Sequence, residues 1–224
     1  MKPRHLLAET RTPDGGRLTL YAHDGQFQIL LDGRELMHSF TTTSEVEMGE
    51  RVSRHLRGRP APRYLIGGLG LGFTLRAVLA DLPADGRVTV AELLPAVVDW
   101  NRAHLRALNG ALLDDPRVEV HTGDVGALLA ASEAAAYDGI LLDVDNGPTA
   151  MVQANNAALY EDPSLQRLKR ALRPGGQIAF WSASADAAFA KRLRRTGFAI
   201  EAVPTRAYPA AKRPSYIVYY AVAR

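Results

Sequence analysis

The chain has 224 residues, no cysteine, and 27 Lys and Arg residues against 24 Asp and Glu residues, which gives a formal net charge of +3. The absence of cysteine excludes disulfide scaffolds, zinc sites with cysteine ligands and cysteine nucleophiles. So small a positive charge gives little support for nucleic-acid binding, and no apolar run approaches the roughly 18 residues that cross a membrane. We therefore expect a cytoplasmic protein with one main domain and a small appendage.

The N-terminal part predicts a small antiparallel sheet followed by a helix. Apolar and polar residues alternate over 17–23 and 27–31, and the Asp-Gly pairs at 24–25 and 32–33 are typical of tight hairpin turns. Ser44 and Glu47 have the spacing of a capping box, which predicts a helix over 44–57. A Gly- and Pro-rich linker follows, so we expect an N-terminal part at 1–59 and a main domain at 60–224.

Strands and helices alternate from residue 63 onward. Strands are expected at 64–66, 87–91, 117–121, 139–142, 177–181, 198–203 and 216–223, and helices at 73–80, 95–108, 125–131, 157–172 and 185–195. This order predicts an α/β fold, a three-layer sandwich with a mostly parallel seven-stranded sheet. The last two strands are expected to form an antiparallel hairpin at one edge.

A glycine-rich loop lies where the first of these strands meets a helix. Its glycines, Gly67, Gly68, Gly70 and Gly72, allow a sharp turn and a close approach of a ligand to the backbone. Phe73 stands where a dinucleotide fingerprint has its last glycine, which weighs against NAD. Glu92 ends the next strand, where an acid can bind both ribose hydroxyls of a nucleoside; a solvated carboxylate at a helix N-terminus is the alternative.

Three further acids follow the ends of later strands. Asp124 can cap the helix after it, and it can also accept from an adenine amine. Asp143 and Asp145 come directly after the fourth strand, at the edge of the sheet where open α/β folds bind ligands, although a polar turn would explain them as well. We expect Asp143 and Asp145 to orient or deprotonate an acceptor.

These segments carry a family resemblance. The stretches 67–76, 88–92, 123–124, 137–143 and 172–176 fall in the order seen in class I S-adenosylmethionine-dependent methyltransferases, and the chain resembles their spermidine synthase-like branch. The resemblance implies a Rossmann-like fold, S-adenosylmethionine or its decarboxylated form as cofactor, and a homodimer. It also implies that Asp143 contributes to cofactor binding as well as to catalysis.

One departure from the branch bears on the donor. Spermidine synthases carry G-G-G-D-G-G, whose acid faces the amino end of decarboxylated S-adenosylmethionine, and here that position is Gly70. Loss of this carboxylate removes repulsion against the carboxylate of ordinary S-adenosylmethionine. The resemblance and this departure favour methyl transfer to a small-molecule acceptor; aminopropyl transfer to a polyamine and a non-catalytic nucleoside-binding protein are the alternatives.

The acceptor pocket is the least determined part of the sequence. Tyr160 and Trp181 are candidates for its wall and floor, although packing in the core or at the sheet edge would explain either aromatic residue. Glu47, together with Glu45, can supply negative charge for a cationic acceptor. No metal site is expected, because the six histidines are scattered along the chain.

Overall fold

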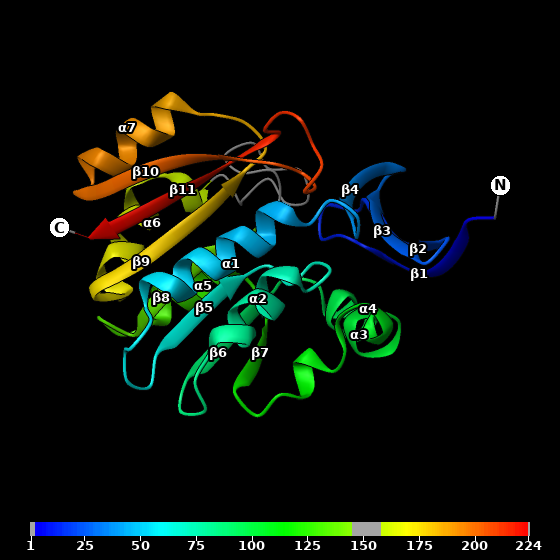
Figure 1. Ribbon diagram of the computed structural model, residues 1–224, viewed down its shortest axis with the longest axis horizontal. Helices are drawn as coiled ribbons and strands as arrows, with labels where there is room; N and C mark the ends of the chain where they lie inside the picture. The colour runs from blue at the N-terminus through cyan, green and yellow to red at the C-terminus, as the bar shows by residue number, and fades with distance from the viewer. Residues whose placement is uncertain (1–2, 145–157, 224) are drawn as a thin grey trace.

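Two sheets organise the computed structural model, which describes residues 3–144 and 158–223. The smaller sheet is antiparallel and holds β1 (His5–Arg11), β2 (Arg17–His23), β3 (Gln26–Leu31) and β4 (Arg34–His38) in that order. Both Asp-Gly pairs have positive φ at each residue, as two-residue hairpin turns require, so the expected meander is confirmed. The sheet lies at one end of the molecule beside α3 (Pro95–Ala103), as Figure 1 shows.

The larger sheet has seven strands in the order β10-β11-β9-β8-β5-β6-β7. The strands are β5 (Arg63–Gly67), β6 (Arg87–Glu92), β7 (Val118–Thr122), β8 (Tyr137–Leu142), β9 (Leu172–Ser182), β10 (Phe198–Thr205) and β11 (Tyr216–Ala223). Among these described strands, β11 alone runs opposite to the others, and it pairs antiparallel with both β9 and β10. The expected α/β fold with a mostly parallel seven-stranded sheet is therefore confirmed.

Helices cover both faces of this sheet (Figure 1). One face carries α1 (Thr43–His55), α2 (Phe73–Asp81) and α3, and the other carries α5 (Val125–Ala131), α6 (Asp162–Ala171) and α7 (Ala187–Arg195). Alternate strand residues feed the two apolar cores: Leu141 of β8 packs with the first group, and Ile140 and Leu142 pack with the second. Leu18 and Leu20 of the small sheet join the first core, so the two sheets share buried surface.

The structure differs from the sequence-based expectations at several elements. In the described part of the helix expected over 157–172, α6 begins at Asp162, and β9 begins at Leu172 instead of residue 177. Strand β1 was not expected. Helix α1 has Thr42 as its N-cap residue without a side-chain cap bond, so the predicted capping box is wrong. The helix expected over 95–108 is two helices, α3 and α4 (Arg106–Asn109), because the N–H groups of His104 and Leu105 both turn to the Trp100 carbonyl.

Helix α1 packs tightly on the large sheet's helical layer, although it precedes the expected domain boundary. A Cβ atom added at Gly49 would lie 2.6 Å from the Cβ of Ala77 and 3.1 Å from the carbonyl oxygen of Thr74, so α1 and α2 approach as closely as a glycine permits. The boundary between 1–59 and 60–224 stays a prediction, but α1 belongs to the layer that covers the large sheet.

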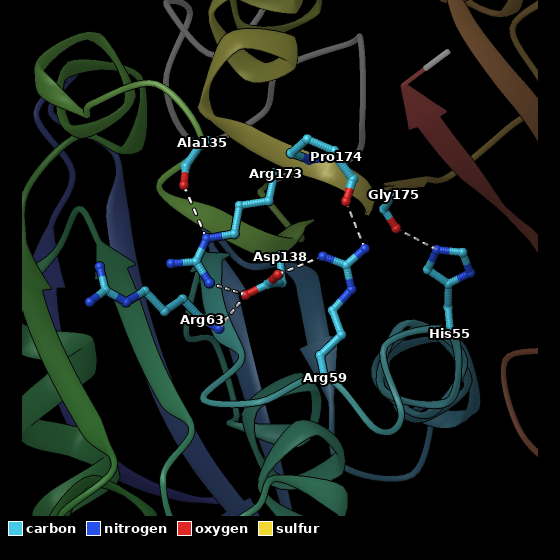
Figure 2. Close-up of polar contacts among 8 residues, drawn as sticks. All are labelled: His55, Arg59, Arg63, Ala135, Asp138, Arg173, Pro174 and Gly175. Atoms are coloured by element: carbon cyan, nitrogen blue, oxygen red, sulfur yellow. Dashed lines mark hydrogen bonds and ion pairs between the residues drawn. The ribbon is translucent and has the colours of Figure 1, made fainter.

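The linker after α1 is attached to the amino ends of β8 and β9 through one buried carboxylate (Figure 2). Asp138 is 2% exposed and accepts from Arg59 Nη1 at 2.8 Å, Arg173 Nη1 at 3.0 Å and the backbone N–H of Arg63 at 2.9 Å. Arg59 also donates to the Pro174 carbonyl at 2.8 Å. A buried charge with two cationic partners and a backbone donor is fully compensated, so this cluster stabilises the fold.

No helix among residues 3–144 and 158–223 is long and apolar enough to cross a membrane.

Replacing Asp138 with Asn tests the contribution of this cluster to stability. The variant leaves two partly buried guanidinium groups without their carboxylate, and we expect the free energy of unfolding to fall by about 3 kcal/mol. Asp81→Asn is the matched control, because its ion pair with Arg57 is exposed and 3.4 Å long, and it should cost less than about 1 kcal/mol. Equal losses in urea unfolding would contradict the assignment.

Candidate functional site

The glycine loop can adopt its path only because it lacks side chains at defined positions. Gly68 has φ +91°, and a Cβ atom there would lie 2.2 Å from the carbonyl oxygen of Asp143. Gly70 and Gly72 also have positive φ, and Gly72 directly precedes α2. A side chain at Gly67, in β5, would collide with Leu142 at 2.9 Å. The loop therefore lies directly against the end of β8.

Polar side chains hold this loop in place. Glu92 Oε2 accepts from the backbone N–H of Leu69 at 2.9 Å, and Glu92 Oε1 accepts from that of Leu94 at 2.9 Å. Asn101 of α3 donates to the Gly70 carbonyl at 2.9 Å and to the Val97 carbonyl at 2.9 Å. Sequence reasoning missed Asn101, because a single Asn within a helix carries no motif.

A first cavity lies between this loop and the small sheet. Three carboxylates line it: Glu92 at the end of β6, Asp124 before α5 and Asp143 after β8. Asp124 Oδ1 caps α5 by accepting from the Ala127 N–H at 2.7 Å, which confirms its expected structural role. The remaining wall is mostly apolar and includes Leu18, Ile29, Leu36, Met37, Ala91, Leu93, Leu94, Val97, Val125 and Val144. An apolar lining with a few polar groups suits a nucleoside.

A second cavity is lined by β4 and by the glycine loop. It is more polar, and its ionisable and aromatic lining residues are Glu35, His38, Glu45, Phe73, Asp143, Trp181 and Tyr216. Leu36, Met37, Gly70 and Asp143 line both cavities. Asp143 is the carboxylate that the two linings share.

Asp143 and Glu45 are carboxyl groups with altered protonation. Burial raises the pKa of Asp143 to about 6, although the Thr74 hydroxyl, which donates to Asp143 Oδ2 at 2.8 Å, opposes this shift. Burial and then the negative charge of Asp143 raise the pKa of Glu45 to about 7. The pair therefore changes charge close to neutral pH.

The structure separates the other expected pocket residues. Trp181 lines the second cavity, with its ring 4.9 Å from that of Tyr216. Tyr160 lies in neither cavity: it is 1% exposed and packs edge-on against Phe189 in the core, so it is a structural residue. Asp145 lies outside the described residues.

Glu47 is also not a pocket residue. It is exposed on α1 and absent from the lining of both cavities. Two residues along a helix differ in direction by about 200°, so Glu45 faces the cavity and Glu47 faces away. The acid that α1 contributes is therefore Glu45. In the described part of the chain, no three acids or histidines come together as metal ligands would.

Glu45→Gln tests the cost of burying this acid. The pKa of Glu45 rises from 4.5 to about 7 on folding, so the folded state binds more protons between these values and stability falls as the pH rises through them. The uncharged variant escapes this loss. We expect it to be more stable than the wild type by about 3 kcal/mol at pH 8 and by little at pH 4 in urea unfolding. A difference independent of pH would contradict the shift.

Comparisons with known proteins agree with this architecture. The family model of the spermine/spermidine synthase domain matches residues 56–192. Putrescine N-methyltransferase 1 from Nicotiana tabacum is 35% identical over 121 residues, which cover 53% of this chain and 30% of that protein. Polyamine aminopropyltransferase 1 from Streptomyces coelicolor is 31% identical over 170 residues, which cover 75% of this chain and 30% of that protein. The matches thus span about 30% of the length of these relatives.

Solved structures share the fold. Spermidine synthase from Thermotoga maritima matches with a TM-score of 0.73 at 18% identity, covering 97% of this chain and 72% of that one. A probable spermidine synthase from Corynebacterium glutamicum matches with a TM-score of 0.69 at 16% identity, covering 99% of this chain and 81% of that one. The family model, which matches more than half of the chain, confirms the resemblance in the sequence: the chain belongs to the spermine/spermidine synthase family.

Proposed function

We propose that this protein is an S-adenosylmethionine-dependent transferase that moves a methyl group to a small amine. The proposal rests on two cavities that share Asp143 in their linings. One is mostly apolar and suits a nucleoside, and the other is lined with several acids. Related proteins named for methyl transfer to putrescine and for aminopropyl transfer to polyamines support a transferase that acts on amines.

The first cavity fits the donor. In this proposal Glu92 binds the ribose hydroxyls, Asp124 accepts from the adenine amine, and the apolar side chains of the lining cover the base. A carboxylate has about four acceptor positions, so Glu92 can bind hydroxyls while it holds the N–H groups of Leu69 and Leu94. S-adenosylmethionine, when bound, supplies a methyl group on a positively charged sulfur.

The surroundings of Gly70 favour methyl transfer over aminopropyl transfer. A Cβ atom at Gly70 would lie 2.6 Å from the Met37 sulfur, so a thioether occupies the space that an acid at this position would need. Because residue 70 is a glycine and not an acid, it places no negative charge beside the carboxylate of S-adenosylmethionine. Like charges about 4 Å apart would cost about 4 kcal/mol at an effective dielectric constant of about 20.

The second cavity supports a cationic acceptor. Glu35, Glu45 and Asp143 line it, and no Lys or Arg is among its described lining residues. The rings of Trp181 and Tyr216 add faces that attract ammonium groups. An amine is therefore the acceptor class that this lining would bind best.

Aminopropyl transfer is the second candidate. The Streptomyces coelicolor aminopropyltransferase matches 75% of this chain, a larger share than the plant methyltransferase matches. The same amine pocket would serve both reactions, so the donor distinguishes them. A nucleoside-binding protein without activity would bind the donor and turn over no amine.

Calorimetry with the two donors tests the choice. We expect S-adenosylmethionine to bind at least about tenfold more tightly than its decarboxylated form, because no acid stands at Gly70 to repel the carboxylate. The double variant Gly70→Asp with Met37→Ala should reverse the preference, and Met37→Ala alone is its control. Tighter binding of the decarboxylated donor by the wild type would favour aminopropyl transfer. Binding of neither donor would refute the proposal.

Glu92→Ala tests the donor site. The variant loses the predicted ribose contact and two hydrogen bonds that fix the loop, so the dissociation constant for S-adenosylmethionine should rise at least about thirtyfold. Glu119→Ala, on β7 and outside both cavities, is the control and should bind like the wild type. Equal binding curves for Glu92→Ala and the wild type would remove this assignment.

A further inference from the structure

We propose that Glu45 takes the proton that the acceptor amine must lose before it can react, acting as one member of a carboxyl pair with Asp143. The inference rests on the proposed function and deepens it. It assigns a proton-accepting role to a residue of the N-terminal helix rather than to the glycine loop or the strand ends alone.

Helix packing positions Glu45 opposite Asp143. Glu45 lies one turn before Gly49 and thus on the same face of α1. That face contacts α2 so closely that a Cβ atom at Gly49 would lie 3.1 Å from the Thr74 carbonyl oxygen. The Thr74 hydroxyl in turn donates to Asp143 at 2.8 Å. The contact between the two helices therefore brings both carboxyl groups to one cavity.

The groups around Glu45 leave its charge without a cationic partner in the described part of this cavity. Asp143 faces it from the end of β8, Glu35 and His38 from β4, and Tyr216 from β11. The Ser44 hydroxyl donates to Glu45, and no Lys or Arg lines the cavity. Only a proton, the His38 imidazole in its charged form or a cationic ligand can balance the acids.

Trp181 gives an independent indication that a ligand completes this cavity. Its indole Nε1 is buried and has no hydrogen-bond partner among residues 3–144 and 158–223, although the side chain lines the cavity. Buried N–H groups normally have a partner. An oxygen atom of the bound donor would supply one.

The protonation of the pair suits this role. With pKa values raised to about 6 for Asp143 and about 7 for Glu45, the pair carries two negative charges only above about pH 7. In that state it attracts an ammonium group and can take one proton from it. A carboxyl with an ordinary pKa would be a weaker base for the same step.

One N–H bond of the acceptor's ammonium group breaks, its electron pair stays on nitrogen, and the proton forms an O–H bond with Glu45. The nitrogen lone pair then forms the N–C bond to the methyl group as the C–S bond breaks, and that electron pair stays on sulfur. The product leaves as a methylammonium ion, and Glu45 releases its proton to water.

The pH dependence of Glu45→Gln tests the role of this residue, with Glu50→Gln, exposed on the same helix, as the control. For wild-type protein with S-adenosylmethionine and putrescine, kcat/KM should rise with pH and level off near pH 7. Glu45→Gln should lower kcat/KM about a hundredfold and should remove the change of slope near pH 7. The dissociation constant of the donor should stay the same. If the wild type turns over and Glu45→Gln shows the same rate and pH profile, the inference is overturned but the proposed function stands. If the wild type does not turn over, the proposed function is refuted as well.

Carbon-13 NMR titration of the side-chain carboxyl groups tests the pair without turnover. In the wild type, Glu45 should titrate near pH 7. In Asp143→Asn, its midpoint should shift to lower pH, because the neighbouring negative charge is gone. An unchanged midpoint for Glu45 in Asp143→Asn would show that the two groups do not act as a pair and would overturn the inference.

Discussion

The two hydrogen bonds that Glu92 accepts from separate backbone segments set the geometry of the whole site. Its carboxylate fixes the N–H groups of Leu69 in the glycine loop and of Leu94 before α3, and so joins the ends of β5 and β6. Gly68 then lies against the carbonyl of Asp143, which adds the end of β8. Both cavities border this arrangement, and Asp143 belongs to the lining of each.

Two groups of buried carboxylates show how the chain divides stability from function. Asp138, at the amino ends of the strands, is compensated by Arg59, Arg173 and a backbone N–H, and it strengthens the fold. Glu45 and Asp143 line the second cavity near the carboxyl ends of the strands, and the described side chains that donate to them are the hydroxyls of Ser44 and Thr74. Their raised pKa values mean that folding works against their charge. A cationic ligand would relieve this cost, so the site is less stable than the cluster at the opposite end until it is filled.

Local patterns predicted most of the fold, and packing decided what they missed. Alternation and Asp-Gly turns give the hairpins, and the position of Asp143 after a buried strand places it at the binding edge. The choice between Glu45 and Glu47 depends on which face of α1 meets α2, and Gly49, the residue that sets this contact, carries no motif. Tyr160 likewise follows the ligand-binding edge in sequence but turns into the aromatic core beneath it, which only the three-dimensional arrangement reveals.

A crystal structure with S-adenosylhomocysteine and putrescine tests the central claim most directly. We expect the ribose on Glu92, the adenine amine at Asp124, the sulfur beside Asp143, and the amine between Asp143 and Glu45. A nucleoside bound outside the first cavity, or an amine that lies away from both carboxyl groups, would contradict it.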